Sequence, residues 1–253
     1  MTLPDPVKFL FVFARILGLF AVAPPWAGRG VPVARLGAAL GASVLVVSWA
    51  GGGPPAATDA WGVGLGVISE TGVGAALGGL LALFFSAYQT AGHLIGNQMG
   101  FGWAGFYDPR TNESVDDLAE LYHRLALLLF FILDGPWRLL KLTVWSFEKI
   151  APGQALWTGR LAGVWVESVG RSMALAAAAA APTVGALWLA SLLVGFLVRA
   201  APQMNLAAVD FPARALIGFA SLWVGGAALI RFFPGTAATA FDQLSLFLKT
   251  LGG

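Results

Sequence analysis

Cysteine is absent from the 253 residues, and histidine occurs only twice. The lack of cysteine excludes disulfides, thiolate metal sites and cysteine nucleophiles. Neither His93 nor His123 lies in a metal-ligand spacing with a carboxylate or with the other histidine. The sequence patterns of serine hydrolases, P-loop nucleotide sites and zinc peptidases are also missing. These absences predict a protein without a catalytic centre, a metal site or a cofactor.

Charged residues are scarce as well, since they make up 11% of the chain while hydrophobic residues make up 58%. An average soluble domain has about 25% charged residues. With a mean hydropathy of +0.77, the chain holds more apolar side chains than one core can bury. Lipid or partner proteins must therefore cover the excess. The 15 basic residues are scattered singly, which argues against a nucleic-acid-binding surface.

The apolar residues form long segments that predict an all-α, membrane-associated protein. A membrane-crossing helix needs about 17 to 25 apolar residues. Six segments reach or approach that length: residues 7–23, 31–50, 62–101, 118–133, 174–198 and 213–233. The first resembles a signal peptide, but Asp5, Arg15 and the following prolines argue against cleavage. The third is too long for one crossing, so we expect it to break at residues 70–72. Residues 137–150 are typical of an interfacial helix, and the total is roughly five to seven helices.

Glycine and proline give further expectations about the helices. Glycines recur at four-residue spacing, which lets helix backbones approach closely. Pro182 predicts a kink, whereas Pro202 and Pro212 predict a helix break between residues 200 and 212. Pro234 with the following glycine predicts another break.

Four ionisable residues lie within the apolar segments, and such residues usually mark a transport pathway or a buried partner. They are Arg15, Arg35, Glu70 and Arg231. In a transporter they could form a coupling site, and in a multi-subunit assembly they could pair across interfaces. Snorkelling to the membrane surface is an alternative for Arg15 and Arg231.

The segment GFGWAGFYDPRTNES at residues 100–114 interleaves large aromatic residues with glycines before a polar turn. A regular helix with glycines at 100, 102 and 105 would not pack all of these aromatics in a core. One interpretation is an aromatic belt at a membrane surface. The other is a hydrophobic constriction that closes a pore and can move aside.

Four motifs resemble the FliR family of flagellar export-gate proteins, whose injectisome counterpart is called SctT. The most specific is RAAPQMN at residues 199–205 followed by Phe211 and Pro212. The others are FARILGLFAVAPPWAGRGVPVARL near the N-terminus, the stretch from Gln98 through LALLLFFILDG, and SFEKIAPG at residues 146–153. Asp210 departs from the pattern, because family members usually carry a small residue there. The Phe-Pro pair looks more like the flagellar branch.

The resemblance implies a single export domain over residues 1–253, built of helical hairpins and assembled into a hetero-oligomeric helical gate rather than a simple bilayer bundle. It implies FliP-like and FliQ-like partner subunits, FlhB-like and FlhA-like export proteins, and unfolded protein substrates. The location it implies is the flagellar basal body in the bacterial inner membrane. By position, the channel plug would comprise Phe101, Trp103, Phe106, Tyr107 and Asp108. The subunit-interface motif would comprise Arg199, Pro202, Gln203, Asn205, Phe211 and Pro212.

Two other functions remain open at the level of sequence. A secondary transporter would use Glu70 with Arg15 or Arg35 as an intramembrane coupling site, but the sequence shows no convincing internal repeat. A structural scaffold would recruit partners without lining a pore.

Overall fold

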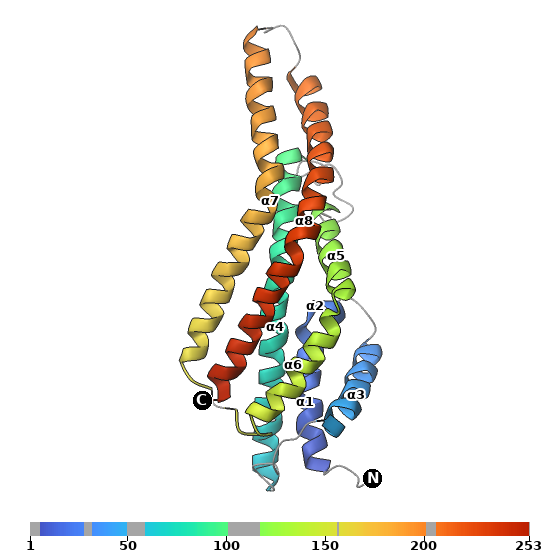
Figure 1. Cartoon of the computed structure of the whole chain (residues 1–253), viewed down its shortest axis with the longest axis vertical. Helices are drawn as coiled ribbons and strands as arrows, with labels where there is room; N and C mark the ends of the chain where they lie inside the picture. The colour runs from blue at the N-terminus through green and yellow to red at the C-terminus, as the bar shows by residue number, and fades with distance from the viewer. Residues whose placement is uncertain are drawn as a thin grey trace. The chain divides into compact units, whose positions relative to one another are not determined.

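The computed structural model of the chain describes residues 6–27, 32–49, 59–100, 117–155, 157–200 and 206–252. Within these ranges all regular secondary structure is helical, so the prediction of an all-α fold is confirmed for the described residues (Figure 1). Eight helices are present there, more than expected, because a four-residue helix follows the first one. Their bounds are α1 Pro6–Val22, α2 Pro24–Ala27, α3 Pro32–Trp49, α4 Ala60–Met99, α5 Asp117–Ile132, α6 Gly135–Lys149, α7 Arg160–Ala200 and α8 Leu206–Gly252.

The chain divides into two compact units, and the long helices α4, α7 and α8 contribute residues to both. Unit 1 comprises Met1–Phe84, Phe130–Gly170 and Ala237–Gly253. Unit 2 comprises Phe85–Leu129 and Arg171–Thr236.

Unit 1 is built around α1, which contacts α2 and α3 and crosses the first half of α4. The core consists of large apolar side chains with almost no exposed surface, among them Phe11, Leu19, Leu77, Phe147 and Phe247. The start of α7 also reaches α4, where a Cβ on Gly79 would lie 2.6 Å from the Trp165 ring. Burial of these apolar surfaces, together with the van der Waals contacts that they make with one another, is the main contribution that stabilises unit 1.

Unit 2 contains the second half of α4, α5, and the facing parts of α7 and α8. The helices α4 and α5 touch where Gly92 lies against the backbone of Leu118. The helix α8 is joined to α4 by a hydrogen bond between the Tyr88 and Thr236 hydroxyls, 2.6 Å long.

The expected break at residues 70–72 is wrong, because α4 runs without interruption from Ala60 to Met99. Three local features keep the helix intact there. Glu70 is fully buried with its charge compensated. The Thr71 hydroxyl donates to the carbonyl oxygen of Val67 in the preceding turn, at 2.8 Å. Gly72 leaves room for the ring of Trp157. A segment that its sequence predicts to be a weak point of the helix is thus stabilised by the tertiary contacts of Glu70 and Gly72 and by one hydrogen bond within the helix.

The expectations at the prolines are met only in part. The helix α7 ends at Ala200 and α8 begins at Leu206, so the chain does change helix in the expected region. However, Pro212 and Pro234 lie inside α8, and α7 also continues through Pro182. A proline removes one backbone hydrogen bond, and long packed helices tolerate that loss when neighbouring elements hold both sides. The breaks expected at Pro212 and Pro234 are therefore wrong.

Two of the described helical segments are long and apolar enough to cross a membrane, Ala60–Met99 and Arg160–Leu197. A third is possible if the bent pair Pro212–Trp223 and Gly225–Gly252 counts as one span. At a rise of 1.5 Å per residue, the 40 residues of α4 extend over about 60 Å. That length is about twice the hydrocarbon thickness of a bilayer, so part of each long helix must have surroundings other than lipid tails.

Candidate functional site

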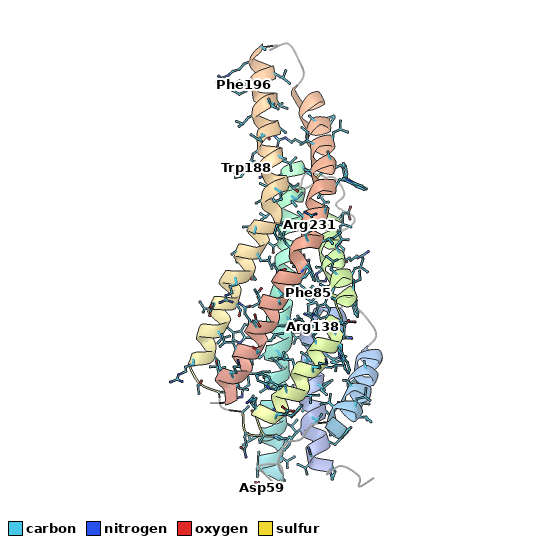
Figure 2. All side chains as sticks on the ribbon, viewed as in Figure 1. Asp59, Phe85, Arg138, Trp188, Phe196 and Arg231 are labelled. Carbon is cyan, nitrogen blue, oxygen red and sulfur yellow. The ribbon has the colours of Figure 1, made fainter. Side chains whose placement is uncertain are left out.

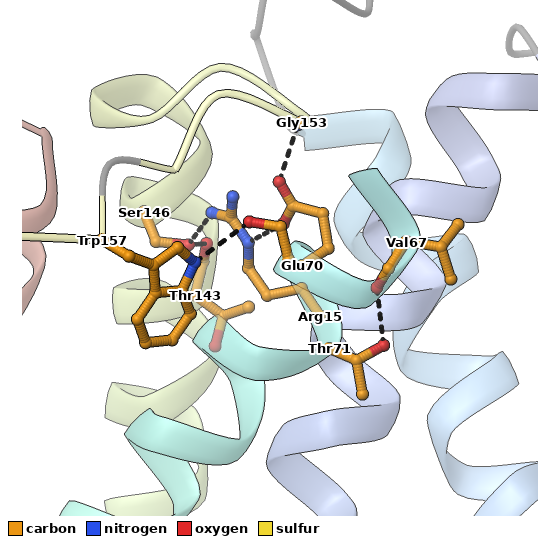
Figure 3. A network of polar contacts seen from close by, with 9 residues as sticks. Arg15, Val67, Glu70, Thr71, Thr143, Ser146, Gly153 and Trp157 are labelled. Atoms are coloured by element: carbon orange, nitrogen blue, oxygen red, sulfur yellow. Dashed lines mark hydrogen bonds and ion pairs between the residues drawn. The ribbon is translucent and has the colours of Figure 1, made fainter. Parts of the chain in front are cut away.

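The most distinctive feature of unit 1 is a buried ion pair between Arg15 on α1 and Glu70 on α4. Arg15 Nε donates to Glu70 Oε2 at 2.5 Å, and neither side chain has any exposed surface. Figure 3 shows the two side chains meeting between their helices. Sequence reasoning named both residues, and the structure brings them together.

Both partners occupy the buried stripes of their helices. Residues 11, 15, 18 and 19 are buried on α1, and residues 66, 70, 73, 74 and 77 are buried on α4. Spacings of three and four residues place side chains on one face of a helix. The ion pair is therefore positioned by the same periodicity that positions the apolar core.

Two further segments add hydrogen bonds to the pair. Arg15 Nη1 donates to Ser146 Oγ on α6 at 2.8 Å, and Ser146 Oγ donates onward to the carbonyl oxygen of Thr143 at 2.6 Å. On the other side, the backbone N–H of Gly153 donates to Glu70 Oε1 at 2.8 Å. The network thus joins α1, α4, α6 and the segment that follows α6 (Figure 3).

The guanidinium of Arg15 also lies over the ring of Phe147, with 3.9 Å between Arg15 Cζ and the ring centroid. This geometry is favourable for a cation–π interaction, which is strongest where water is excluded. Arg15 Nη2 has no hydrogen-bond partner among the described residues. Burying an ion pair costs desolvation energy, which the attraction and the surrounding hydrogen bonds offset only when the geometry is good. Three hydrogen bonds and one aromatic face provide that geometry here.

Glycines permit the close crossing of α1 and α4 beside the pair. A Cβ on Gly74 would overlap the carbonyl oxygen of Arg15, and a Cβ on Gly18 would overlap that of Thr71. A Cβ on Gly78 would lie 2.8 Å from the carbonyl oxygen of Leu19. Side chains at these positions would separate the helices. The four-residue spacing of Gly74 and Gly78 therefore serves packing within the chain, whereas Gly37 and Gly41 meet no atom within 4 Å among the described residues.

The segment after α6 is fixed on α4 by two contacts. Gly153 has a positive φ of 82°, a conformation that glycine adopts without the steric cost paid by other residues. In that conformation its N–H points to Glu70. The indole N–H of Trp157 donates to Ser69 Oγ at 3.2 Å, while its ring packs on Gly72.

The arrangement is suited to holding segments together rather than to reacting with a substrate. Both carboxylate oxygens of Glu70 accept hydrogen bonds from the protein itself. The described residues contain no group of three or more histidine, cysteine, aspartate or glutamate side chains that could hold a metal. Within the described part of the chain, the network connects four segments to one another.

The remaining sequence-based site residues are placed less completely. The proposed plug residues, from Phe101 to Asp108, lie outside the described residues, as do Pro202, Gln203 and Asn205. Arg199 is exposed in the last turn of α7, and Pro212 is exposed on α8. Arg35 and Phe211 belong to α3 and α8, but their side chains lie outside the described ones. Arg231 is exposed on α8 (Figure 2).

Sequence reasoning assigned no role to Ser146, Phe147 or Gly153. They lie in SFEKIAPG, a motif that contributes to the family resemblance but predicts no role for its individual residues. The sequence feature that points to them is a serine on the inward face of an amphipathic helix, followed by Pro-Gly. Nothing in the linear sequence indicates that this serine meets an arginine more than a hundred positions away.

Residues 7–240 match the family model described as "Bacterial export proteins, family 1". Three similar proteins carry the name flagellar biosynthetic protein FliR. The protein of Bacillus subtilis is 30% identical over 220 residues, covering 85% of each chain. That of Pectobacterium carotovorum is 28% identical, covering 94% of this chain and 89% of its own. That of Escherichia coli is 29% identical, covering 83% and 80% respectively.

Proposed function

This chain belongs to the bacterial export proteins, family 1, and we propose that it is a non-enzymatic subunit of the flagellar-type, type III protein export gate. The family match carries this conclusion, because it spans residues 7–240. The similar proteins of three bacteria are all named flagellar biosynthetic proteins. We treat the chain as one export domain, since the match runs through both compact units.

The buried network suits the role of a gate subunit. It turns the charges of Arg15 and Glu70 inward and connects α1, α4 and α6 to the segment leading into α7. A subunit held together in this way can present its apolar surfaces to partners in a defined arrangement. The network would then support assembly without taking part in transport.

Partner subunits would cover the apolar surface that the chain itself leaves exposed. On α7, Trp188 is 60% exposed and Phe196 is 67% exposed, and both side chains point away from the helix (Figure 2). On α8, Trp223 is 86% exposed. We propose FliP-like and FliQ-like subunits as the partners at such surfaces, with FlhB-like and FlhA-like proteins acting beside them. The assembly would lie in the bacterial inner membrane, in the flagellar basal body.

The segment between α4 and α5 is the proposed plug of the channel. Its composition supports this role, since Phe101, Trp103, Phe106 and Tyr107 are interleaved with glycines at positions 100, 102 and 105. Aromatic side chains can close a narrow pore by excluding water, and glycines allow the segment to move aside. Asp108 follows at the start of the polar turn. Unfolded protein substrates would displace these residues when export begins.

Copurification tests the assignment to the gate. Tagged protein is expressed together with candidate FliP-like and FliQ-like subunits, and the mass of the intact complex is measured. We expect a discrete complex that contains one copy of this chain. A stable chain that purifies alone under the same conditions would overturn the proposal.

Conductance measurements test the plug separately. Glycine at positions 101, 103, 106 and 107 should make the assembled gate leak ions in planar bilayers. A matched control is Trp61→Gly, which removes an aromatic side chain that is 83% exposed on α4. Conductance that stays the same in the plug variant would contradict the plug while leaving the gate assignment intact.

The transporter alternative is not favoured by the geometry of the ion pair. A coupling residue must exchange its partner for a solute or a proton, yet both oxygens of Glu70 are occupied and the side chain has no exposed surface. The scaffold alternative differs from the gate in that the chain would line no pore. Crosslinks from residues 100–112 distinguish the two, because contact with exported substrate excludes the scaffold and contact with outer surfaces alone supports it.

A further inference from the structure

Two weak points in neighbouring helices of unit 2 lie opposite each other. Pro182 interrupts the hydrogen bonding of α7, and Gly225 with Gly226 forms a glycine pair within α8. A Cβ on Gly225 would lie 3.0 Å from Thr183 Oγ1, so the residue after the proline faces the glycine pair directly.

Each weak point lowers the resistance of its own helix to bending. Pro182 has no N–H, so one hydrogen bond to the preceding turn is missing, and the proline ring crowds that turn. Glycine has more backbone freedom than any other residue, so the glycine pair makes α8 easier to bend at that point. The axis of α8 changes direction by 41° between Pro212–Trp223 and Gly225–Gly252. The bend in α8 therefore lies opposite the point where Pro182 interrupts the hydrogen bonding of α7.

The α8 segment after the glycine pair is held on α4. The Tyr88 hydroxyl bonds to Thr236 Oγ1, and the ring of Tyr88 packs on that of Phe233 with 5.3 Å between centroids. The α8 segment before the glycine pair meets α4 at Gly218, which contacts the side chain of Met99. Methionine is unbranched and polarisable, so this contact can adapt to a change in position.

We propose that Pro182 and Thr183, together with Gly225 and Gly226, form a hinge across the α7–α8 hairpin. The moving part comprises residues 184–200 and 206–223, and the fixed part is the segment anchored through Tyr88. Because both helices yield at the same level, the hairpin can bend without pulling its helices apart. The moving part also carries large exposed apolar side chains, including Trp188, Phe196 and Trp223. The hinge lets this surface change its tilt relative to the segment anchored through Tyr88.

Spin-label distance measurements on the full chain in detergent test the hinge. The native chain has no cysteine, so introduced pairs are the only labelling sites. One pair, at Val169 and Leu193, spans Pro182 on α7. Another pair, at Leu216 and Phe232, spans the glycine pair on α8 and ends before Pro234. All four side chains are well exposed.

A matched control lies on α4. Leu65 and Gln89 have the same sequence separation as Val169 and Leu193, both are exposed, and no proline lies between them. The glycine pair within this span, Gly78 and Gly79, is packed against α1 and α7. In a straight helix this separation is about 36 Å. We expect at least twofold broader distance distributions for the α7 and α8 pairs than for the control pair.

Two variants give the hinge its decisive test. Pro182→Ala should narrow the α7 distribution toward the control width, and Gly226→Ala should narrow the α8 distribution. A Cβ at position 226 meets no atom within 4 Å, so this variant stiffens the helix without a clash even if Pro182→Ala folds poorly. Distributions as narrow as the control, or broad ones that neither variant narrows, would overturn the proposal. The measurement requires no partner subunit, so its result is independent of the gate assignment.

Discussion

Arg15 Nε and Glu70 Oε2 lie 2.5 Å apart although the residues are 55 positions apart in sequence, and neither side chain is exposed. A buried ion pair restricts how two helices can pack, because any other register leaves one charge without a partner. Apolar helices rich in glycine have many similar packing arrangements available. The pair selects one of them for α1 and α4.

Removing one partner of this pair should destabilise the protein more than removing both. Glu70→Ala leaves the Arg15 charge buried without compensation, and loss of one partner of a buried pair costs about 3–5 kcal/mol. The double variant Arg15→Met with Glu70→Met replaces both charges by flexible apolar side chains. Its free energy of unfolding should lie above that of Glu70→Ala. The free energies of unfolding are measured by adding sodium dodecyl sulfate to the protein in detergent and monitoring tryptophan fluorescence.

Glu120→Ala is the control for the same carboxylate loss at an exposed pair. Glu120 accepts from Arg124 Nε at 2.7 Å one turn along α5, and both side chains are well exposed. Such pairs contribute about 0.3–0.5 kcal/mol. Equal losses in Glu70→Ala and Glu120→Ala would show that burial of the Arg15 pair has no energetic consequence.

The sequence was a good guide to the helices and a poor guide to their contacts. The apolar segments and their spacing predict α1, α5 and α7, because burial periodicity is a local property. The expected break at residues 70–72 is wrong, since a buried charge and a nearby glycine weaken a helix only when nothing compensates the charge or packs against the glycine. Arg15 supplies the compensating charge and Trp157 fills the space at Gly72, and both lie far from this point in sequence. The partners Ser146 and Gly153 were missed for the same reason.

Gly74→Ala should lower the free energy of unfolding by about 1–3 kcal/mol, the usual cost of overpacking a core. The added methyl group would overlap the backbone carbonyl oxygen of Arg15, and a backbone atom cannot move aside without separating α1 from α4. Gly64→Ala is the matched control on the same helix, because a Cβ there meets nothing within 4 Å. That control should be neutral or stabilising by up to about 1 kcal/mol. Similar unfolding curves for the two variants would contradict the close crossing.

Gly153→Ala should destabilise the protein by about 1–2 kcal/mol, the cost of placing an L-residue in the left-handed region. The native φ is 82°, and relaxing it would turn the N–H away from Glu70 Oε1. Gly159→Ala lies on the same connection and has open space around its Cβ, so it serves as the comparison. Thermal unfolding of both variants in detergent gives the difference. If Gly153→Ala melts at the native temperature, the hydrogen bond to Glu70 does not fix this segment.

Gln203→Ala with Asn205→Ala should abolish assembly into the gate while leaving the expression of the chain unchanged. Both amides lie in the motif between α7 and α8, next to a proline that leaves backbone groups in need of partners. If the amides bind across a subunit boundary, their loss leaves polar groups of the neighbouring subunit unsatisfied, at about 1–3 kcal/mol each. Gln154→Ala removes an exposed amide elsewhere and should assemble normally. Copurification with the partner subunits is the readout, because a role in local capping would lower thermal stability without preventing the complex from forming. Intact complexes of the double variant would therefore assign these amides to capping alone.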